Sequence, residues 1–171
     1  MLVLCLPVEA KKEKSTLLTG GIEYTVETAR QEAFDGIEYT IPLSMLKPYL
    51  KDSNYGENKK AMRNGQEDLS DRWIGYFSNG RYNVVYKNDR YKEYSYSSNG
   101  RLRGITIRTS LDFPVKGYTY NIFGKLEDVT FYVKVNNDSH IYVYTPEGVL
   151  TSHWINNKCY DKDGKVVLES Y

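Results

Sequence analysis

The sequence has few of the residues that metal sites and disulfide bonds require. Its 171 residues include two cysteines, Cys5 and Cys159, and two histidines, His140 and His153. Metal sites usually draw on clustered His, Cys and carboxylate side chains, and the chain has neither a His-x-x-x-His nor a Cys-x-x-Cys spacing. We therefore expect no metal, no cofactor and no disulfide framework.

Familiar catalytic motifs are also lacking. The sequence contains no Gly-x-Ser-x-Gly elbow, no phosphate-binding glycine-rich loop and no dinucleotide fingerprint. Asp161-x-Asp163-Gly164 resembles the start of a calcium loop, but residues 165–167 add no ligands, so we interpret it as an Asp-Gly turn. No carboxylate lies in a distinctive apolar setting that would tune its pKa. We predict a protein that is not an enzyme, with an unrecognised hydrolase as the open alternative.

Long hydrophobic runs are missing too, and no segment is long and apolar enough to cross a bilayer. Residues 1–10 are a short apolar run that ends in Val8-x-Ala10 and precedes charged residues. This order is typical of the end of a secretory signal, although the basic first region is absent. We predict that residues 1–10 are a signal remnant and residues 11–20 a linker, and that the protein is secreted, periplasmic or on the cell surface. The alternative is an apolar N-terminus or a first strand.

An excess of charge of one sign is also absent, since the formal net charge is +1. Residues 71–108 contain eight Lys and Arg against three Asp and Glu, which we interpret as the solvated face of strands. A nucleic-acid partner is therefore not expected.

What the chain does have is a repeated phrase, whose common form is Tyr-x-x-x-Gly-basic-apolar. Successive tyrosines of the phrase are 20, 24, 24 and 16 residues apart, and periods near this length indicate a repeated supersecondary unit. Each glycine is expected to take positive φ at a tight turn, where a Cβ would clash. The five turn glycines are Gly80, Gly100, Gly124, Gly148 and Gly164.

The residues around each glycine predict a hairpin. An Asn-Gly pair between apolar-alternating segments is the strongest short-range hairpin signal. After the turn the apolar spacing slips by one residue, which predicts a β-bulge near Gly104 and near Asp128. We therefore predict a mostly β fold: about five antiparallel hairpins in a meander over residues 72–171, forming an extended or rolled sheet.

Residues 21–71 differ in composition from the repeats that follow, and they predict a small N-terminal cap with both helix and strand. Residues 26–34 are rich in helix formers and lie between two Gly-Ile-Glu-Tyr-Thr strings, so a short helix between two small strands is expected, with one long hairpin as the alternative. Residues 58–64, followed by Gly65, are a second helix candidate. The polar stretch 51–71 is expected to shield the edge of the first hairpin.

Tyrosine is unusually frequent, with 17 copies against five phenylalanines. Period two puts pairs of tyrosines on one face of the sheet, where a ring with a polar end suits either a thin core or a binding surface. We predict that they form a ladder on a concave face, with a basic rim and a tryptophan beside them. The candidate binding residues are the ladder Tyr94, Tyr96, Tyr118, Tyr120, Tyr142 and Tyr144, the rim Arg81, Arg101 and Lys125, and Trp154.

The repeated phrase resembles the tyrosine–aspartate (YD or RHS) repeats of bacterial envelope and toxin-shell proteins over residues 74–168. The aspartate after the tyrosine is present at Asp161 alone, while Phe77, Ser97, Asn121 and Thr145 occupy that position in the other copies. The resemblance implies spiralling hairpin sheets in shells or scaffolds without catalysis. The recurrence of tyrosine and glycine is also similar to that in MORN-like repeats and, less closely, to the aromatic hairpin repeats of cell-wall-binding modules.

The function predicted from the sequence is an exported, non-catalytic scaffold or binding protein that recognises a protein partner or an envelope polysaccharide. A carbohydrate- or cell-wall-binding module is the first alternative, in which tyrosine rings stack on sugars. A sheet with a free edge could also pair with a second copy of the chain.

Overall fold

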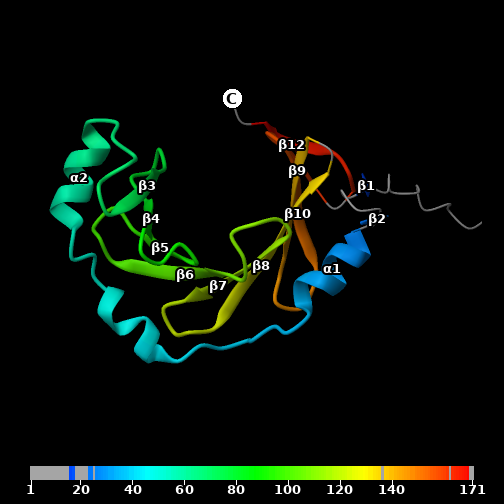
Figure 1. Cartoon of the computed structure of the whole chain (residues 1–171), viewed down its shortest axis with the longest axis horizontal. Coiled ribbons are helices and arrows are strands. Elements are labelled where there is room, and N and C mark those ends of the chain that lie inside the picture. Colours follow the sequence, from blue (N-terminus) through cyan, green and yellow to red (C-terminus); the bar gives the residue numbers. More distant parts are fainter. Residues whose placement is uncertain (1–15, 18–22, 25, 136, 162, 170–171) are drawn as a thin grey trace, which may run out of the picture.

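The computed structural model describes residues 16–17, 23–24, 26–135, 137–161 and 163–169. Its main feature is one open sheet of ten antiparallel strands in sequence order, rolled into a crescent (Figure 1). This confirms the predicted mostly β meander of hairpins. The strands are β3 (Arg72–Tyr76), β4 (Tyr82–Tyr86), β5 (Lys92–Tyr96), β6 (Leu102–Arg108), β7 (Val115–Asn121), β8 (Leu126–Val135), β9 (Asp138–Tyr144), β10 (Leu150–Ile155), β11 (Lys158–Tyr160) and β12 (Val166–Glu169).

The five repeated phrases form five turns with the same hydrogen bonds. In each, the residue after the tyrosine donates its N–H to the carbonyl four residues on, as Asn121 does to Lys125, and the glycine N–H bonds back to that residue. All five glycines have positive φ, between 71° and 82°. These are the conformations that the glycine column predicts.

In three of the copies the side chain after the tyrosine accepts two backbone hydrogen bonds of the turn. Asn121 Oδ1 and Asp161 Oδ1 each accept hydrogen bonds from the backbone N–H groups two and four residues on, at 2.9–3.1 Å. Thr145 Oγ1 accepts the same two bonds at 3.3 and 3.4 Å. Asn, Thr and Asp are therefore equivalent at this position, since each has a short side chain whose oxygen accepts the N–H groups of the turn.

Four of the five hairpins contain a bulge three residues after the glycine. The extra residue is Arg103, Glu127, Thr151 or Val167, where the strand register shifts. The first two lie next to Gly104 and Asp128, where the apolar spacing predicts them. Because a bulge bends its strand and increases the local twist, its repetition contributes to the rolling of the sheet.

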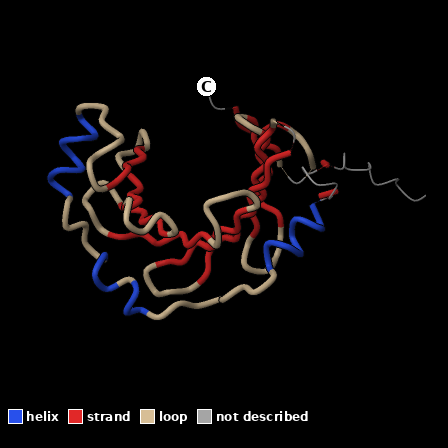
Figure 2. Tube along the Cα trace, in the orientation of Figure 1, coloured by secondary structure: helices blue, strands red, loops and turns tan. Residues whose placement is uncertain are grey.

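The N-terminal segment wraps around the convex side of the crescent (Figure 2). The predicted helix over residues 26–34 is present, and the predicted helix near Gly65 starts earlier than expected, at Tyr55. The small strand expected after the first helix is reduced to a single bridge at Thr40. The elements of this segment are β1 (Thr16–Leu17), β2 (Glu23–Tyr24), α1 (Val26–Phe34), the 3-10 helices η1 (Leu43–Met45) and η2 (Lys47–Tyr49), and α2 (Tyr55–Arg63).

Residues 36–54, here called the strap, dock on two hairpin turns in the same way. Thr40 bridges to Lys125 of one turn, and Lys51 bridges to Arg101 of the preceding turn. Each bridge has two backbone hydrogen bonds of 2.8–3.0 Å, one of them accepted by the carbonyl of the turn glycine. The strap thus runs opposite to the order of the hairpins, and eleven residues separate its two docking points.

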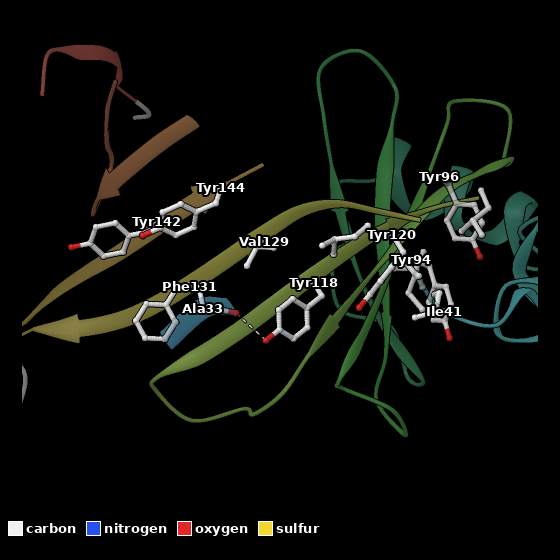
Figure 3. Packing of buried hydrophobic residues seen from close by; sticks show 14 of the residues in the cluster. Ala33, Ile41, Tyr94, Tyr96, Tyr118, Tyr120, Val129, Phe131, Tyr142 and Tyr144 are labelled. Atoms are coloured by element: carbon white, nitrogen blue, oxygen red, sulfur yellow. Dashed lines mark hydrogen bonds between the residues drawn. The ribbon is translucent and has the colours of Figure 1, made fainter. Parts of the chain in front are cut away.

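The ladder tyrosines form the core between the sheet and this N-terminal segment (Figure 3). Tyr118 donates its hydroxyl to the Ala33 carbonyl at 3.0 Å, and Tyr120 donates to the Glu38 carbonyl at 2.7 Å. The Tyr49 ring of the strap stacks on Tyr94 with centroids 4.1 Å apart. The rings therefore fill a thin core while their hydroxyl groups reach backbone acceptors at its margin.

A buried polar cluster joins the cap to the first hairpin. Asp52 Oδ2 accepts from the Tyr82 hydroxyl at 2.5 Å and from Asn58 Nδ2 at 2.8 Å. Arg72 Nε donates to Asn58 Oδ1 at 2.7 Å. All four side chains belong to residues that are almost fully buried, so their mutual hydrogen bonds offset the cost of removing them from water.

The two edges of the sheet differ. Residues 67–69 lie along the outer edge of β3, where Ile74 N–H donates to Glu67 and Leu69 N–H donates to Arg72. At the opposite edge, all four residues of β12 are exposed.

Candidate functional site

The six ladder tyrosines do not form an open platform. Each is 0–7% exposed, and the face that they share lies beneath the N-terminal segment, since Tyr118 and Tyr120 bond to Ala33 and Glu38. This segment lies on the convex side of the crescent (Figure 2). This placement differs from the concave aromatic face expected from the sequence, because residues 26–65 cover that face. Of the remaining candidates, Arg81, Arg101 and Lys125 are exposed at equivalent turn positions, and Trp154 is half-buried on the other face.

The concave face carries the residues that alternate with the ladder. Tyr94 faces the core, so its neighbours Glu93 and Ser95 face the hollow side. Strand register extends this set across the sheet: Glu93 lies opposite Thr106, Thr106 opposite Thr119, and Thr119 opposite Asp128. The middle of the concave face is thus made of small polar residues.

Beside these polar residues the concave face contains a pocket of about 340 Å³. Two cross-strand pairs form its walls, Trp73 with Val85 and Val115 with Tyr132. Loops on the side opposite the five glycine turns close it. The residues that line it are Trp73, Val85, Arg90, Arg108, Ser110, Leu111, Phe113, Val115 and Tyr132.

The loop of residues 109–114 presents apolar side chains at the pocket. Phe113 is 52% exposed and Leu111 39%. Ser110 holds the loop, because its hydroxyl donates to the Asp112 carbonyl and accepts the Asp112 N–H. These hydrogen bonds already order the loop, so binding a partner through Phe113 costs little loop conformational entropy.

Two cations lie over the ring of Trp73, which is part of the pocket wall. The Arg90 guanidinium lies 5.4 Å and the Lys87 amine 5.2 Å from the centre of the Trp73 ring. Lys87 forms an ion pair with Asp68 at 2.6 Å, and Arg108 with Glu93. Within the described residues Arg90 has no ion pair, so it is the charge available to an acidic ligand. Burial also raises the pKa of Tyr132.

The carboxylates of the concave face are far apart. Glu93 and Asp128 are three strands apart in register, a backbone separation of about 14 Å. The pKa of Asp128 is raised, first by burial and then by the charge of Glu127. Glycosidase carboxylate pairs lie about 5–9.5 Å apart, and the register does not place Glu93 and Asp128 on neighbouring strands. Among the described residues, no group of three or more His, Cys, Asp or Glu could hold a metal ion.

The two histidines meet on the convex side near the last hairpins. His140 Nδ1 lies 3.1 Å from His153 Nε2, and the His153 ring stacks on Tyr142 at 4.1 Å. Burial and the neighbouring His140 lower the pKa of His153 to about 4, and burial also lowers the pKa of His140. The 13-residue separation gave no signal of this contact, which depends on the pairing of β9 with β10.

Comparisons with family models, with curated proteins and with solved structures found no match to this chain. Within the described residues, no helix has the length and apolar character needed to span a membrane. The geometry of the concave face is therefore the main guide to function.

Proposed function

We propose that this chain is an exported, non-catalytic binding protein that recognises a protein partner through the concave face of its sheet. The observation that carries the proposal is the pocket that exposed Phe113 and Leu111 line together with Trp73, with Arg90 over the Trp73 ring. Aromatic and arginine side chains around a desolvated pocket dominate the energetics of protein interfaces.

A protein partner suits the pocket better than a polysaccharide does. Sugar sites combine exposed rings with amide and carboxylate neighbours, whereas the residues lining this pocket are aliphatic, aromatic, arginine and one serine. The ladder rings that would have stacked on sugars are buried. The separation of Glu93 from Asp128 likewise gives no support to a hydrolase.

Export and a scaffold role remain part of the proposal. The apolar run that ends in Val8-x-Ala10 supports export, although it lies outside the described residues. The resemblance to tyrosine–aspartate repeats supports an envelope or shell setting. The Asn121 and Thr145 side chains fasten their turns as Asp161 does, so these copies form the same turn without the aspartate.

Site-specific photo-cross-linking in cells that express the protein natively tests the proposal. A photoreactive phenylalanine analogue replaces Phe113, and the matched control carries it at Phe123, which is 70% exposed on a turn outside the pocket. We expect one discrete protein cross-linked from position 113, lost with Arg90→Glu, and none from position 123.

Equal products from both positions would contradict the proposal. So would co-sedimentation with cell-wall polysaccharide that Phe113→Ser abolishes and Phe123→Ser preserves, since that result would support the carbohydrate alternative.

A further inference from the structure

An apolar row extends from the pocket across the concave face to the free edge. Register places Val115 opposite Tyr132, Tyr132 opposite Ile141, and Ile141 opposite Trp154. Trp154 in turn lies opposite Cys159, and Cys159 opposite Leu168. These six residues, called the apolar row, share one face and come from six consecutive strands, β7 to β12.

Much of the apolar row is accessible. Tyr132, Ile141 and Trp154 are half-buried, and Leu168 is 55% exposed. Val115 and Cys159 are buried, at 8% and 5% exposure, so the accessible part of the row is interrupted at β11. Apolar side chains that gather on one face mark an interaction site more often than scattered exposed residues do. The first two members, Val115 and Tyr132, are also walls of the pocket, so the two features form one surface.

The direction of the row indicates what kind of element fits it. Five inter-strand steps span about 24 Å, which is the length of about 16 helical residues. An extended segment lying across the strands could not pair with them, and its backbone N–H and C=O groups would face apolar side chains. A helix satisfies its own backbone. Its i, i+3 and i+4 side chains recur about every 5 Å along one face, close to the spacing of the strands.

The charges beside the row favour an acidic helix. At the pocket end lie Arg90, which has no ion pair within the described residues, and Arg108, which is paired with Glu93. Lys134 is exposed two residues after Tyr132 on the same face. Asp128 is the nearby carboxylate on β8, and burial raises its pKa. Electrostatic complementarity would therefore select carboxylates along the flanks of the helix.

We propose that the apolar row binds an acidic amphipathic helix of about 16 residues from a protein partner, laid across β7–β12 with a large apolar side chain in the pocket. This rests on the proposed function, since it specifies the partner element for the same concave face.

Synthetic peptides test this directly on the full chain. The probe is an 18-residue acetylated and amidated peptide with leucine at helical a and d positions, one terminal phenylalanine and glutamate elsewhere. One twin carries lysine in place of glutamate, and another carries two central prolines. Binding is followed by the fluorescence of Trp73 and Trp154, which lie in the pocket and in the row.

We expect the acidic probe to bind at least tenfold more tightly than the lysine twin and the proline twin. Leu168→Glu should weaken its binding at least fivefold. Val166→Glu is the matched control, because Val166 lies on the same strand and is 46% exposed, but it is paired with Tyr160 on the opposite face. Both positions are exposed, so circular dichroism should show the native fold for both variants.

Three results would overturn the inference: no binding of the acidic probe, equal binding of the proline twin, or equal weakening by Leu168→Glu and Val166→Glu. The cross-linking from position 113 is independent of these peptides. A partner captured there together with failed helix binding would leave the proposed function standing and remove the helix as its element.

Discussion

At the scale of single residues, most tyrosines of this chain are structural. Their rings supply the apolar area of a thin core. The hydroxyl groups of Tyr118 and Tyr120 bond to backbone carbonyls, and that of Tyr82 bonds to buried Asp52. Composition alone is compatible with either a core or a binding platform. What decides is the strap, whose docking on the convex face depends on contacts between residues 50 to 85 positions apart, from Lys51 with Arg101 to Thr40 with Lys125.

Tyr82→Phe tests the buried polar cluster. The change removes the hydroxyl that donates to Asp52 at 2.5 Å and leaves a buried carboxylate with one donor fewer. We expect a loss of about 1–3 kcal/mol in the free energy of unfolding by urea. Tyr96→Phe is the control, since Tyr96 is equally buried and stacks on Tyr82 but has no hydroxyl bond to a buried charge. Equal losses in the two variants would contradict the assigned role.

The histidine pair should make stability depend on pH. Both histidines have pKa values below the ordinary 6.5, with His153 at about 4. Between these values the unfolded chain binds more protons than the folded chain, so stability falls as the pH drops from about 6.5 towards 4. Urea unfolding across this range measures it. His153→Phe keeps a ring beside Tyr142 and should flatten the dependence; an unchanged slope in that variant would exclude the pair as its source.

At the scale of elements, the hairpin is the unit that sequence reasoning predicts well. The glycine column, the tyrosine spacing and the slip in apolar phase are local signals, and the five turns and the bulges near Gly104 and Asp128 follow from them. The pocket was not predicted, because Trp73, Arg90, Phe113 and Tyr132 come from separate strands and loops. Period two puts the ladder tyrosines on one face, but it could not show which face of the sheet is left uncovered.

Two turn glycines should respond differently to alanine. Both Gly124 and Gly164 have positive φ, which costs alanine about 1 kcal/mol. A Cβ on Gly124 would also lie 2.4 Å from the Ile41 carbonyl oxygen, whereas a Cβ on Gly164 would meet nothing within 4 Å. We expect Gly124→Ala to destabilise the protein by about 1–3 kcal/mol more than Gly164→Ala, because it breaks a strap hydrogen bond. Equal midpoints of thermal unfolding would contradict the strap contact.

At the scale of the whole molecule, the sheet has one covered face and one open face. The strap and the helices occupy the convex side, so the core lies there and the concave side is left open. Tyr49→Ala tests this division by removing the ring that stacks on Tyr94. We expect a loss of about 2–4 kcal/mol, together with binding of the dye ANS to the uncovered tyrosine face. Native stability without dye binding would mean that the strap does not complete the core.

Hydrogen–deuterium exchange of the full chain, alone and with the partner captured through position 113, tests most directly whether a partner binds the concave face. We expect the partner to slow exchange in residues 109–114 and in β8 to β10, while exchange in the strap, residues 36–54, is unchanged. Slower exchange in the strap with no change in residues 109–114 would place recognition on the convex side and contradict the assignment of the concave face.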